Sequence, residues 1–373
     1  MAKQCKFYAV VLPGLEKIAA AELASLSAHD IEIEHGGINF TGTMQLLYRI
    51  NLRARTITRV LMRLRTFRSM TLEGLAYDLQ KVAWHVFFDE HTKLDVQVNC
   101  HRSRLNHSDD IIEHSLKTIQ QCLPKMGTSD QQKHVQTLHI RIENNRGTLS
   151  LDTSGERLDR RGYRLESGKA PIRETIAAAT LQWMGWQPEQ TLLNPMCGSG
   201  TFAIEAALSA QNIIANAKHD FSLLHWASFK EKEYQKTLER CLNMQKEAES
   251  NIFASDLNES ALKISKSNAQ RAVVEQHIHI SKLDIHQLSK PEISTTGLLI
   301  INPPYGGRIG EEKEIMALWS DLGDIIRQQF LADPAWRTAI ICPEQACEKA
   351  LKLSVKRRLP IAHGGLNVMI LEV

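Results

Sequence analysis

The sequence predicts an α/β protein with a doubly wound, mainly parallel sheet in its C-terminal half and two smaller α+β units before it. Short apolar strands alternate with helices from residue 171 onwards, which is typical of such a sheet. Two short sets of strands and helices precede about residue 155. Residues 158–169, rich in Arg, Gly and charge, are expected to connect the two regions.

The N-terminal region begins with a strand, a helix with regularly spaced Ala and Leu, and two strands around a Gly-Gly turn. A helix and a basic apolar stretch follow, and the second unit reads as helix, strand, helix and a strand pair around Asn-Arg-Gly. The expected elements are 6–12 (strand), 15–26 (helix), 31–42 (strands), 43–54 (helix), 58–67 (apolar and basic), 74–82 (helix), 94–100 (strand), 109–123 (helix) and 137–155 (strands).

The C-terminal half continues as alternating helices and strands. Two apolar runs around His363-Gly364-Gly365 predict a hairpin that adds an antiparallel pair at the sheet edge. Residues 230–250 are so highly charged that we expect a helix exposed to solvent. The expected elements are 173–186 (helix), 191–200 (strand and turn), 201–210 (helix), 251–257 (strand), 259–270 (helix), 277–285 (strand), 297–305 (strand), 315–330 (helix), 337–343 (strand) and 356–373 (hairpin).

The composition excludes several classes of protein. No apolar run reaches 18 residues, and the N-terminus lacks the layout of a signal peptide. The seven cysteines are scattered, and no pair shows metal-ligand spacing backed by histidines. We therefore expect a cytoplasmic protein without a metal site or a membrane partner. The oligomeric state is not predictable from this sequence.

An arginine stripe lies in the N-terminal region, which carries the excess of positive charge. Residues 35–72 contain seven arginines and no acidic residue. Such a stripe either tracks the phosphates of a nucleic acid or is a polar surface whose partners lie elsewhere in the fold. We take four of these side chains as candidate RNA contacts: Arg49, Arg53, Arg55 and Arg59.

A glycine-rich turn, NPMCGSGT, separates the first strand of the C-terminal sheet from a helix. Gly198 and Gly200 let the backbone approach a ligand, and the helix offers free N–H groups. A nicotinamide dinucleotide is disfavoured, because no acidic residue ends a strand about 20 residues later. A P-loop is excluded, since no Gly-Lys-Ser/Thr follows. A tight turn without a ligand remains the alternative.

Two acidic residues end the next two predicted strands. Asp256 could accept both hydroxyls of a ribose, and Asp284 could accept the exocyclic amine of an adenine. Either residue could instead cap the helix that follows it, because Asp is a favoured N-cap. Ligands of such sheets bind at the carboxyl ends of the strands, so three ligand-type features in succession indicate one site.

The fourth strand ends in Asn302-Pro303-Pro304-Tyr305. The Asn carboxamide oxygen and a prolyl carbonyl oxygen are two rigid acceptors that can face a planar amino group. Tyr305 offers a ring on which a base can stack. The motif therefore predicts a pocket for the exocyclic amine of a nucleobase that is flipped out or single-stranded. The alternative is a strand that simply ends at prolines.

Together these motifs resemble the class I S-adenosylmethionine-dependent methyltransferases that modify exocyclic amines. The junction LDTSGERLDRRGYR…APIRETIAAATL is similar to that of THUMP-domain RNA methyltransferases, in particular the bacterial large-subunit ribosomal RNA guanine-N2 methyltransferases. The resemblance implies a ferredoxin-like piece (1–44), a THUMP RNA-binding domain (45–155) and a Rossmann-like seven-stranded methyltransferase domain (156–373, with 156–170 as connector). It also implies structured RNA as the partner and transfer to guanine N2 of 23S ribosomal RNA.

The resemblance also assigns site residues. The implied catalytic set is Asn302, Pro303, Pro304 and Tyr305. The implied cofactor set is Asn194, Pro195, Met196, Cys197, Gly198, Ser199, Gly200, Thr201, Asp256, Leu257, Asp284, Ile285 and Asn302, with Ala170, Ile172 and Thr175 across the methionine end of the cofactor.

The chain departs from the family at Asn194, where Asp is usual. Asn offers the cofactor's ammonium group only a neutral oxygen, so we expect Asn194→Asp to tighten cofactor binding or leave it unchanged. Three alternatives stay open: a transfer RNA guanine-N2 methyltransferase, an adenine-N6 methyltransferase, and a non-catalytic RNA-binding assembly factor. The sequence does not identify the target nucleotide.

Overall fold

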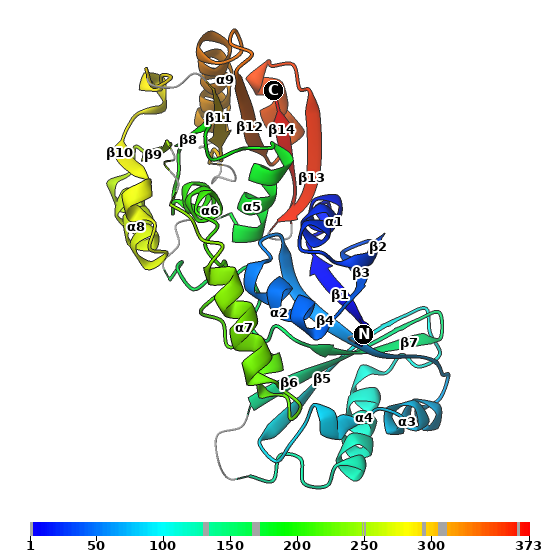
Figure 1. The fold of residues 1–373 in the computed structure, drawn as a ribbon. Coiled ribbons are helices and arrows are strands. Elements are labelled where there is room, and N and C mark those ends of the chain that lie inside the picture. The colour runs from blue at the N-terminus through cyan, green and yellow to red at the C-terminus, as the bar shows by residue number, and fades with distance from the viewer. Residues whose placement is uncertain are drawn as a thin grey trace. The chain divides into compact units, whose positions relative to one another are not determined.

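The computed structural model describes residues 3–129, 134–165, 172–247, 249, 251–292, 296–304, 312–363 and 366–373 (Figure 1). The chain forms two compact units. Unit 1 comprises residues 1–11, 20–158 and 216–241, and unit 2 comprises residues 12–19, 159–215 and 242–373. In the described part of the chain, no helix is long and apolar enough to cross a membrane.

Unit 1 is built on a seven-stranded sheet in the order β2-β3-β1-β4-β7-β6-β5. Its first half follows the β-α-β-β-α-β pattern of a ferredoxin-like fold. The elements are β1 (Cys5–Val11), α1 (Glu16–Ser25), β2 (His29–Glu34), β3 (Gly37–Gly42), α2 (Met44–Arg53) and β4 (Ile57–Arg68). The boundary predicted near residue 44 therefore falls between β3 and α2, inside this pattern.

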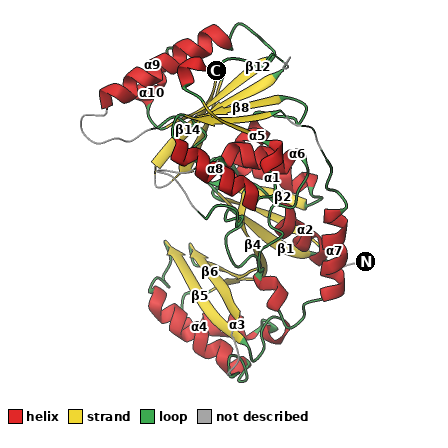
Figure 2. Cartoon of the chain, turned by 90° about the vertical axis from the view of Figure 1, so that its left-hand side faces the viewer, coloured by secondary structure: helices red, strands yellow, loops and turns green. Residues whose placement is uncertain are grey.

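The second half of the sheet shares strand β4 with the first. Residues 57–62 of β4 pair with β1, and residues 61–68 pair with β7, with a register shift between Arg63 and Arg65. Helices α3 and α4 pack against each other and against β4 and β5 (Figures 1 and 2). The elements of this half are α3 (Leu72–Gln80), η1 (Trp84–Val86), β5 (Thr92–His101), α4 (Ser108–Cys122), β6 (His134–Glu143) and β7 (Arg146–Asp152).

A segment from the C-terminal half of the sequence completes unit 1. It contains η2 (Ser222–His225) and α7 (Glu231–Leu242). Tyr234, Thr237 and Cys241 are buried, and the Tyr234 ring lies edge-on to that of Tyr48 with centroids 5.6 Å apart. The prediction of a solvated helix is therefore wrong for one face of α7, because residues spaced by three and four form a stripe that packs on α2.

Unit 2 contains the predicted doubly wound sheet, in the order β10-β9-β8-β11-β12-β14-β13. The pairs from β10 to β12 are parallel, and the β13–β14 hairpin is antiparallel, as expected. The strands are β8 (Thr191–Pro195), β9 (Ile252–Asp256), β10 (His279–Lys282), β11 (Gly297–Ile301), β12 (Trp336–Cys342), β13 (Arg357–His363) and β14 (Leu366–Glu372). The helices are α5 (Glu174–Trp183), α6 (Thr201–Ala210), α8 (Glu259–Arg271), η3 (Glu275–His277), η4 (Ile285–Gln287), α9 (Glu312–Gln329) and α10 (Gln345–Leu351).

The strand order reverses direction at β8, which has β9 on one side and β11 on the other. A crevice at the carboxyl ends of such strands is where open α/β sheets bind ligands. Strand β11 is fully buried, and Leu299 and Ile301 pack with Trp319, Leu322 and Ile326 of α9. This packing fixes the end of β11 and the Asn302 that follows it.

Candidate active site

The glycine-rich turn after β8 requires unusual backbone conformations. Met196, Gly198 and Gly200 have φ angles of 53°, 55° and 80°. A Cβ atom on Gly200 would lie 2.2 Å from the Ser265 Oγ atom of α8, so glycine is needed for close packing there. A Cβ on Gly198 would meet no atom of the described chain within 4 Å, so this backbone faces open space. The turn thus leaves room for a ligand beside Gly198.

Buried polar side chains hold this turn in place. Asn268, which is fully buried on α8, donates from Nδ2 to the Ser199 carbonyl at 3.0 Å. Arg271 donates to Asn268 Oδ1 at 2.6 Å and to the Tyr163 carbonyl at 2.8 Å. Sequence reasoning missed Asn268 and Arg271, because a polar pair on a mixed helix carries no local signal of what it contacts.

Asp256 lies directly against the turn. Its Oδ2 accepts from the Gly198 N–H at 3.0 Å, and its Oδ1 accepts from the Asn258 N–H at 2.9 Å. The N-cap of α8 is Asn258, whose side chain accepts from the Ser260 N–H. The helix-cap alternative for Asp256 is therefore wrong, and the carboxylate faces the turn. Leu257 beside it is 60% exposed, an apolar side chain open to a planar ligand.

Asp284 does act as a cap, and it also joins a charged bridge. Its Oδ1 accepts from the His286 N–H at 3.0 Å and lies 2.7 Å from His286 Nδ1. The other ring nitrogen, Nε2, lies 3.3 Å from Asp321 Oδ2 on α9. Carboxylates accept hydrogen bonds, so both ring nitrogens donate when both contacts form. These hydrogen bonds lower the pKa of Asp284 and raise that of His286.

Asn194 bridges the two strands at the point where the sheet order reverses. Backbone pairing of β8 with β11 ends at Leu193 and Leu299, and the Asn194 Nδ2 then donates to the Ile300 carbonyl at 3.0 Å. A carbonyl only accepts, so the amide nitrogen must face it. Asn194 is 1% exposed, and its Oδ1 has no hydrogen-bond partner among the described residues.

Asn302 presents a second buried acceptor at the end of β11. Its Oδ1 also lacks a partner among the described residues. A buried polar atom left without a partner costs about 1–3 kcal/mol, so each oxygen is expected to receive a donor from a ligand. Pro303 is buried and Pro304 is exposed. Tyr305 lies outside the described residues, and so does Ala170.

The remaining predicted residues are mostly buried. Pro195 ends β8, Ser199 lies in the turn and Thr201 begins α6, and the Ser199 and Thr201 hydroxyls lie 3.3 Å apart. Burial raises the pKa of Cys197 to about 12, so its thiol stays protonated. Ile285 packs into the apolar core of unit 2.

Ile172 and Thr175 lie at the start of α5 and are buried. The Thr175 Oγ1 has no partner among the described residues. The Ile172 carbonyl accepts from Arg164 Nη1 at 2.8 Å, and Arg164 Nη2 also pairs with the buried Glu174 at 2.8 Å. Burial raises the pKa of Glu174 to about 7, although the Arg164 charge opposes this. These contacts anchor Arg164 of the connector to the start of α5.

The arginines predicted to contact RNA take part in the fold of unit 1. Arg49 donates to the Leu26 carbonyl at 3.2 Å. Arg59 pairs with Asp152 and donates to the Gly155 carbonyl at 2.6 Å. Arg53 and Arg55 also have partners within the chain. The four side chains are half-buried.

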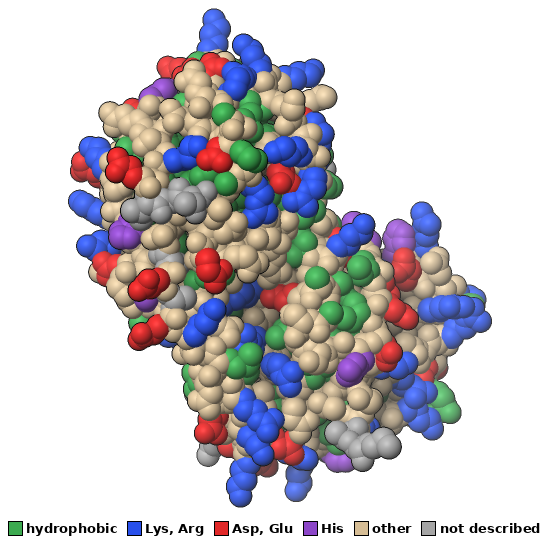
Figure 3. Space-filling view, turned by 45° about the horizontal axis from the view of Figure 1, so that its top comes forward, with side chains coloured by type: hydrophobic (Ala, Val, Ile, Leu, Met, Phe, Trp, Pro, Cys, Tyr) green, Lys and Arg blue, Asp and Glu red, His purple; other side chains and the backbone are tan. Residues whose placement is uncertain are grey.

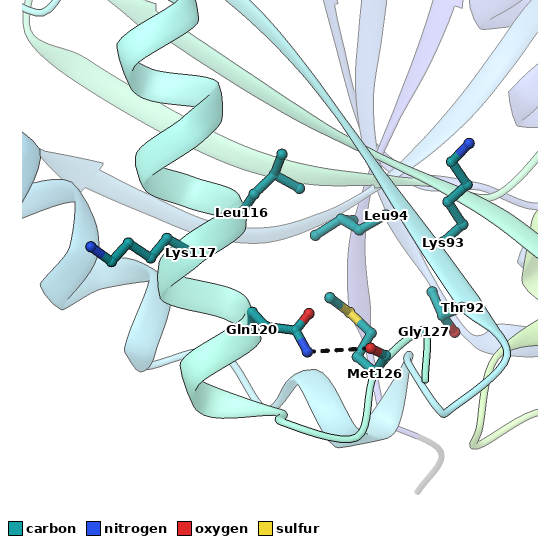
Figure 4. Close-up of a pocket in the computed structure, with 8 residues that line it drawn as sticks. All are labelled: Thr92, Lys93, Leu94, Leu116, Lys117, Gln120, Met126 and Gly127. Carbon is teal, nitrogen blue, oxygen red and sulfur yellow. Dashed lines mark hydrogen bonds between the residues drawn. The ribbon is translucent and has the colours of Figure 1, made fainter. Parts of the chain in front are cut away.

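A cavity of about 580 Å³ lies in unit 1, between β5 and α4 (Figure 4). Leu94, Leu116 and Met126 face it, whereas Lys93 and Lys117 point away from it (Figure 4). Gln120 closes one side by donating to the Met126 carbonyl at 3.3 Å. None of the predicted cofactor or catalytic residues lines this cavity.

Comparison with known proteins places these features in context. A family model described as "RMKL-like, methyltransferase domain" matches residues 161–370, and one described as "RlmL ferredoxin-like domain" matches residues 6–61. A putative RNA methyltransferase of Synechocystis sp. is 32% identical, over 98% of this chain and 96% of that protein.

Two further matches differ in extent. The ribosomal RNA large subunit methyltransferase K/L of Photobacterium profundum is 29% identical over 98% of this chain but only 52% of that protein, so the chain spans about half its length. The solved structure of SMU.472, a putative methyltransferase complexed with SAH, superposes with a TM-score of 0.89, covering 100% of this chain and 98% of that chain. At 24% identity, this likeness shows the fold alone.

Proposed function

The chain belongs to the family of RMKL-like methyltransferase domains, and from this premise we propose that it transfers a methyl group from S-adenosylmethionine to guanine N2 of 23S ribosomal RNA. The observation that carries the proposal is the pair of buried carboxamide oxygens, on Asn194 and Asn302, at the adjacent carboxyl ends of β8 and β11. One suits an ammonium group and the other suits an exocyclic amine.

The residues of the glycine turn fit the cofactor. Asn194 Oδ1 would accept from its ammonium group, and Gly198 leaves space for its backbone approach. Asp256 would hold the ribose hydroxyls with the lone pairs that the Gly198 and Asn258 N–H groups leave free, and Asp284 would take the adenine amine. When bound, the cofactor supplies a sulfonium methyl that needs no further activation.

The acceptor base would be held by the residues after β11. Asn302 Oδ1 and the Pro303 carbonyl would accept the two hydrogens of the exocyclic amine, and Tyr305, outside the described residues, is proposed to stack on the base. Holding the amine in line with the methyl group would supply the rate enhancement, because the entropy cost of bringing the two groups together is paid on binding. Transfer would break the methyl–sulfur bond, leave a neutral thioether and release one proton of the methylated amine to water, so no side chain of unusual pKa is needed as a base.

Asn302→Ala tests this assignment. We expect methyl incorporation into RNA to fall by at least about 100-fold, since one of two acceptors that fix the amine is lost. Binding of the cofactor in calorimetric titration should change less than about threefold. Glu259→Ala, on the exposed first turn of α8, is the control and should keep both properties. Retained turnover by Asn302→Ala would contradict the assignment.

The choice of RNA rests on two relatives, the putative RNA methyltransferase of Synechocystis sp. and the ribosomal RNA large subunit methyltransferase K/L of Photobacterium profundum. Transfer RNA and adenine N6 are second candidates, because the Asn-Pro-Pro acceptors suit any planar amine. A non-catalytic assembly factor is disfavoured by the intact acceptors. The THUMP domain, and RNA contacts by Arg49, Arg53, Arg55 and Arg59, stay predictions.

A further inference from the structure

The second half of the unit 1 sheet has one covered face and one uncovered face. Residues Leu138, Ile140 and Ile142 of β6 alternate with more accessible neighbours and are buried, as are Leu149 and Leu151 of β7. The opposite face carries polar side chains along the strands. Its members in this half include Asn99 and His101 of β5, Arg141 and Glu143 of β6, Arg146 and Thr148 of β7, and Thr66 and Arg68 of β4.

Two arginines oppose each other at the end of this face. Arg68 of β4 is the direct cross-strand partner of Arg146 of β7, and both side chains are exposed. Like charges directly opposite each other destabilise a sheet. Neither guanidinium has a hydrogen-bond or ion-pair partner among the described residues. The opposed pair is therefore unfavourable for the sheet, and both exposed guanidinium groups are available to a ligand.

The loop after β5 brings two more arginines to the same end. It contains Arg102 and Arg104, both exposed and likewise without a described guanidinium partner. The loop is tied to the β6–β7 turn, because the Asn145 N–H donates to Ser103 Oγ at 3.1 Å and the Arg104 N–H donates to Asn145 Oδ1 at 2.8 Å. Arg102 has a φ of 44°, a conformation that is rare for a non-glycine residue.

One acidic residue lies beside this group. Glu143 is the direct cross-strand partner of Arg146 on the side away from Arg68, and its carboxylate forms an ion pair with Arg141 at 2.9 Å. Asp109 and Asp110 follow only in the first turn of α4. Charges of both signs are mixed over the face of the molecule in Figure 3, so net charge alone does not locate a nucleic-acid surface. Four exposed arginines instead lie at one end of this sheet. We name Arg68, Arg102, Arg104 and Arg146 the arginine cluster.

We propose that the arginine cluster binds the phosphate backbone of the RNA substrate, which rests on the proposed function above. Guanidinium groups bind phosphate oxygens in a bidentate manner, and their fixed fork suits this contact. On the described part of this face, the Tyr8 ring is 6% exposed and the Arg63 guanidinium lies 4.1 Å from its centroid, whereas the His101 imidazole is exposed beside the arginines. Arginines outnumber exposed rings at this end of the face, so we infer recognition chiefly by phosphate position and RNA shape.

The arginine cluster also differs from the stripe of Arg49, Arg53, Arg55 and Arg59. Those four side chains are half-buried, and Arg49, Arg53 and Arg59 contact the Leu26 carbonyl, Cys241 and Asp152 of unit 1, so using these three for RNA would require breaking contacts of the fold. The arginine cluster can bind RNA without such a cost. We therefore place the main phosphate contacts at the end of β4, β7 and the loop after β5.

Two double variants of the full chain test the proposal: Arg68→Ala with Arg146→Ala, and Arg102→Ala with Arg104→Ala. The probe is transcribed 23S ribosomal RNA, with affinity measured between 50 and 300 mM KCl. We expect each variant to bind at least about fivefold more weakly at 100 mM, and the slope of log affinity against log salt to fall by about 1.5, since each lost phosphate contact removes about 0.7–0.9. The matched control is Lys236→Ala with Arg240→Ala, two exposed residues of α7.

Folding and chemistry are followed separately. Removing the opposed pair should leave the unfolding temperature unchanged or raised, and cofactor affinity should not change in any variant. Wild-type affinity and salt slope in both variants would overturn the proposal while leaving the methyl-transfer function standing. Weakened binding in the variants, with no methyl transfer by the wild type, would support the surface and contradict the function. If the variants keep wild-type RNA affinity but no longer bind an acidic ribosomal protein, the proposal is overturned in favour of a protein partner.

Discussion

Asn194 illustrates how one side chain can hold the site together. Its amide nitrogen joins β8 to the Ile300 carbonyl, immediately before the residues that would hold the acceptor amine. A carboxylate cannot donate this hydrogen bond, and it would face the Ile300 oxygen with a second acceptor. The Asn194 amide nitrogen therefore has a structural role that the sequence alone did not reveal.

This contact narrows the expectation drawn from the sequence, which was that Asn194→Asp tightens cofactor binding or leaves it unchanged. We now expect the free energy of unfolding to fall by about 1–3 kcal/mol, because a buried hydrogen bond is replaced by two opposed acceptors. Cofactor affinity in calorimetric titration should not increase. Asn212→Asp is the matched control, since Asn212 makes the same type of bond, to the Met244 carbonyl at 2.7 Å, at an exposed place. Unchanged stability together with tighter cofactor binding would refute the bridging role.

At the residue scale, the sequence predicted which residues lie at strand ends better than it predicted the hydrogen-bond partners of those residues. It placed Asn194, Asp256, Asp284 and Asn302 at strand ends, and the structure has each of them there. It left the cap alternative open for both acids, and the structure gives different answers for Asp256 and Asp284. The partners could not be predicted, because hydrogen bonds between separate elements leave no periodic pattern in the chain.

At the element scale, His286 links two segments that flank the site. It joins Asp284, before η4, to Asp321 on α9. Because the two carboxylates raise its pKa, the bridge is complete below the ordinary value of 6.5 and is lost as pH rises through the higher value of the folded protein. The segment that carries Asp284 should then be held less firmly at alkaline pH.

The bridge predicts a pH dependence of cofactor affinity. We expect the dissociation constant of S-adenosylmethionine to rise as pH increases from about 6.5 to 9. In His286→Gln, which cannot change its charge, the constant should vary much less over this range. The measurement is titration calorimetry at several pH values. An identical pH profile for both proteins would show that the bridge does not position Asp284.

At the scale of the whole molecule, the sequence predicted two α+β sets and a parallel sheet, and each is present. It did not predict that β4 serves both halves of the first sheet, because the local pattern of a 12-residue strand does not show which strands it pairs with. It also did not predict that residues 216–241 join unit 1. Pairings between segments far apart in the chain depend on tertiary packing, which composition and periodicity do not encode.

The central claim at this scale is that unit 2 methylates a guanine amine of an RNA that unit 1 helps to bind. Its most direct test is nucleoside mass spectrometry of 23S ribosomal RNA and transfer RNA from a strain that lacks the protein. We predict that the deletion strain loses N2-methylguanosine at one position of 23S ribosomal RNA and regains it with the wild-type protein but not with Asn302→Ala. Unchanged 23S ribosomal RNA, or a loss confined to N6-methyladenosine or to transfer RNA, would contradict the account.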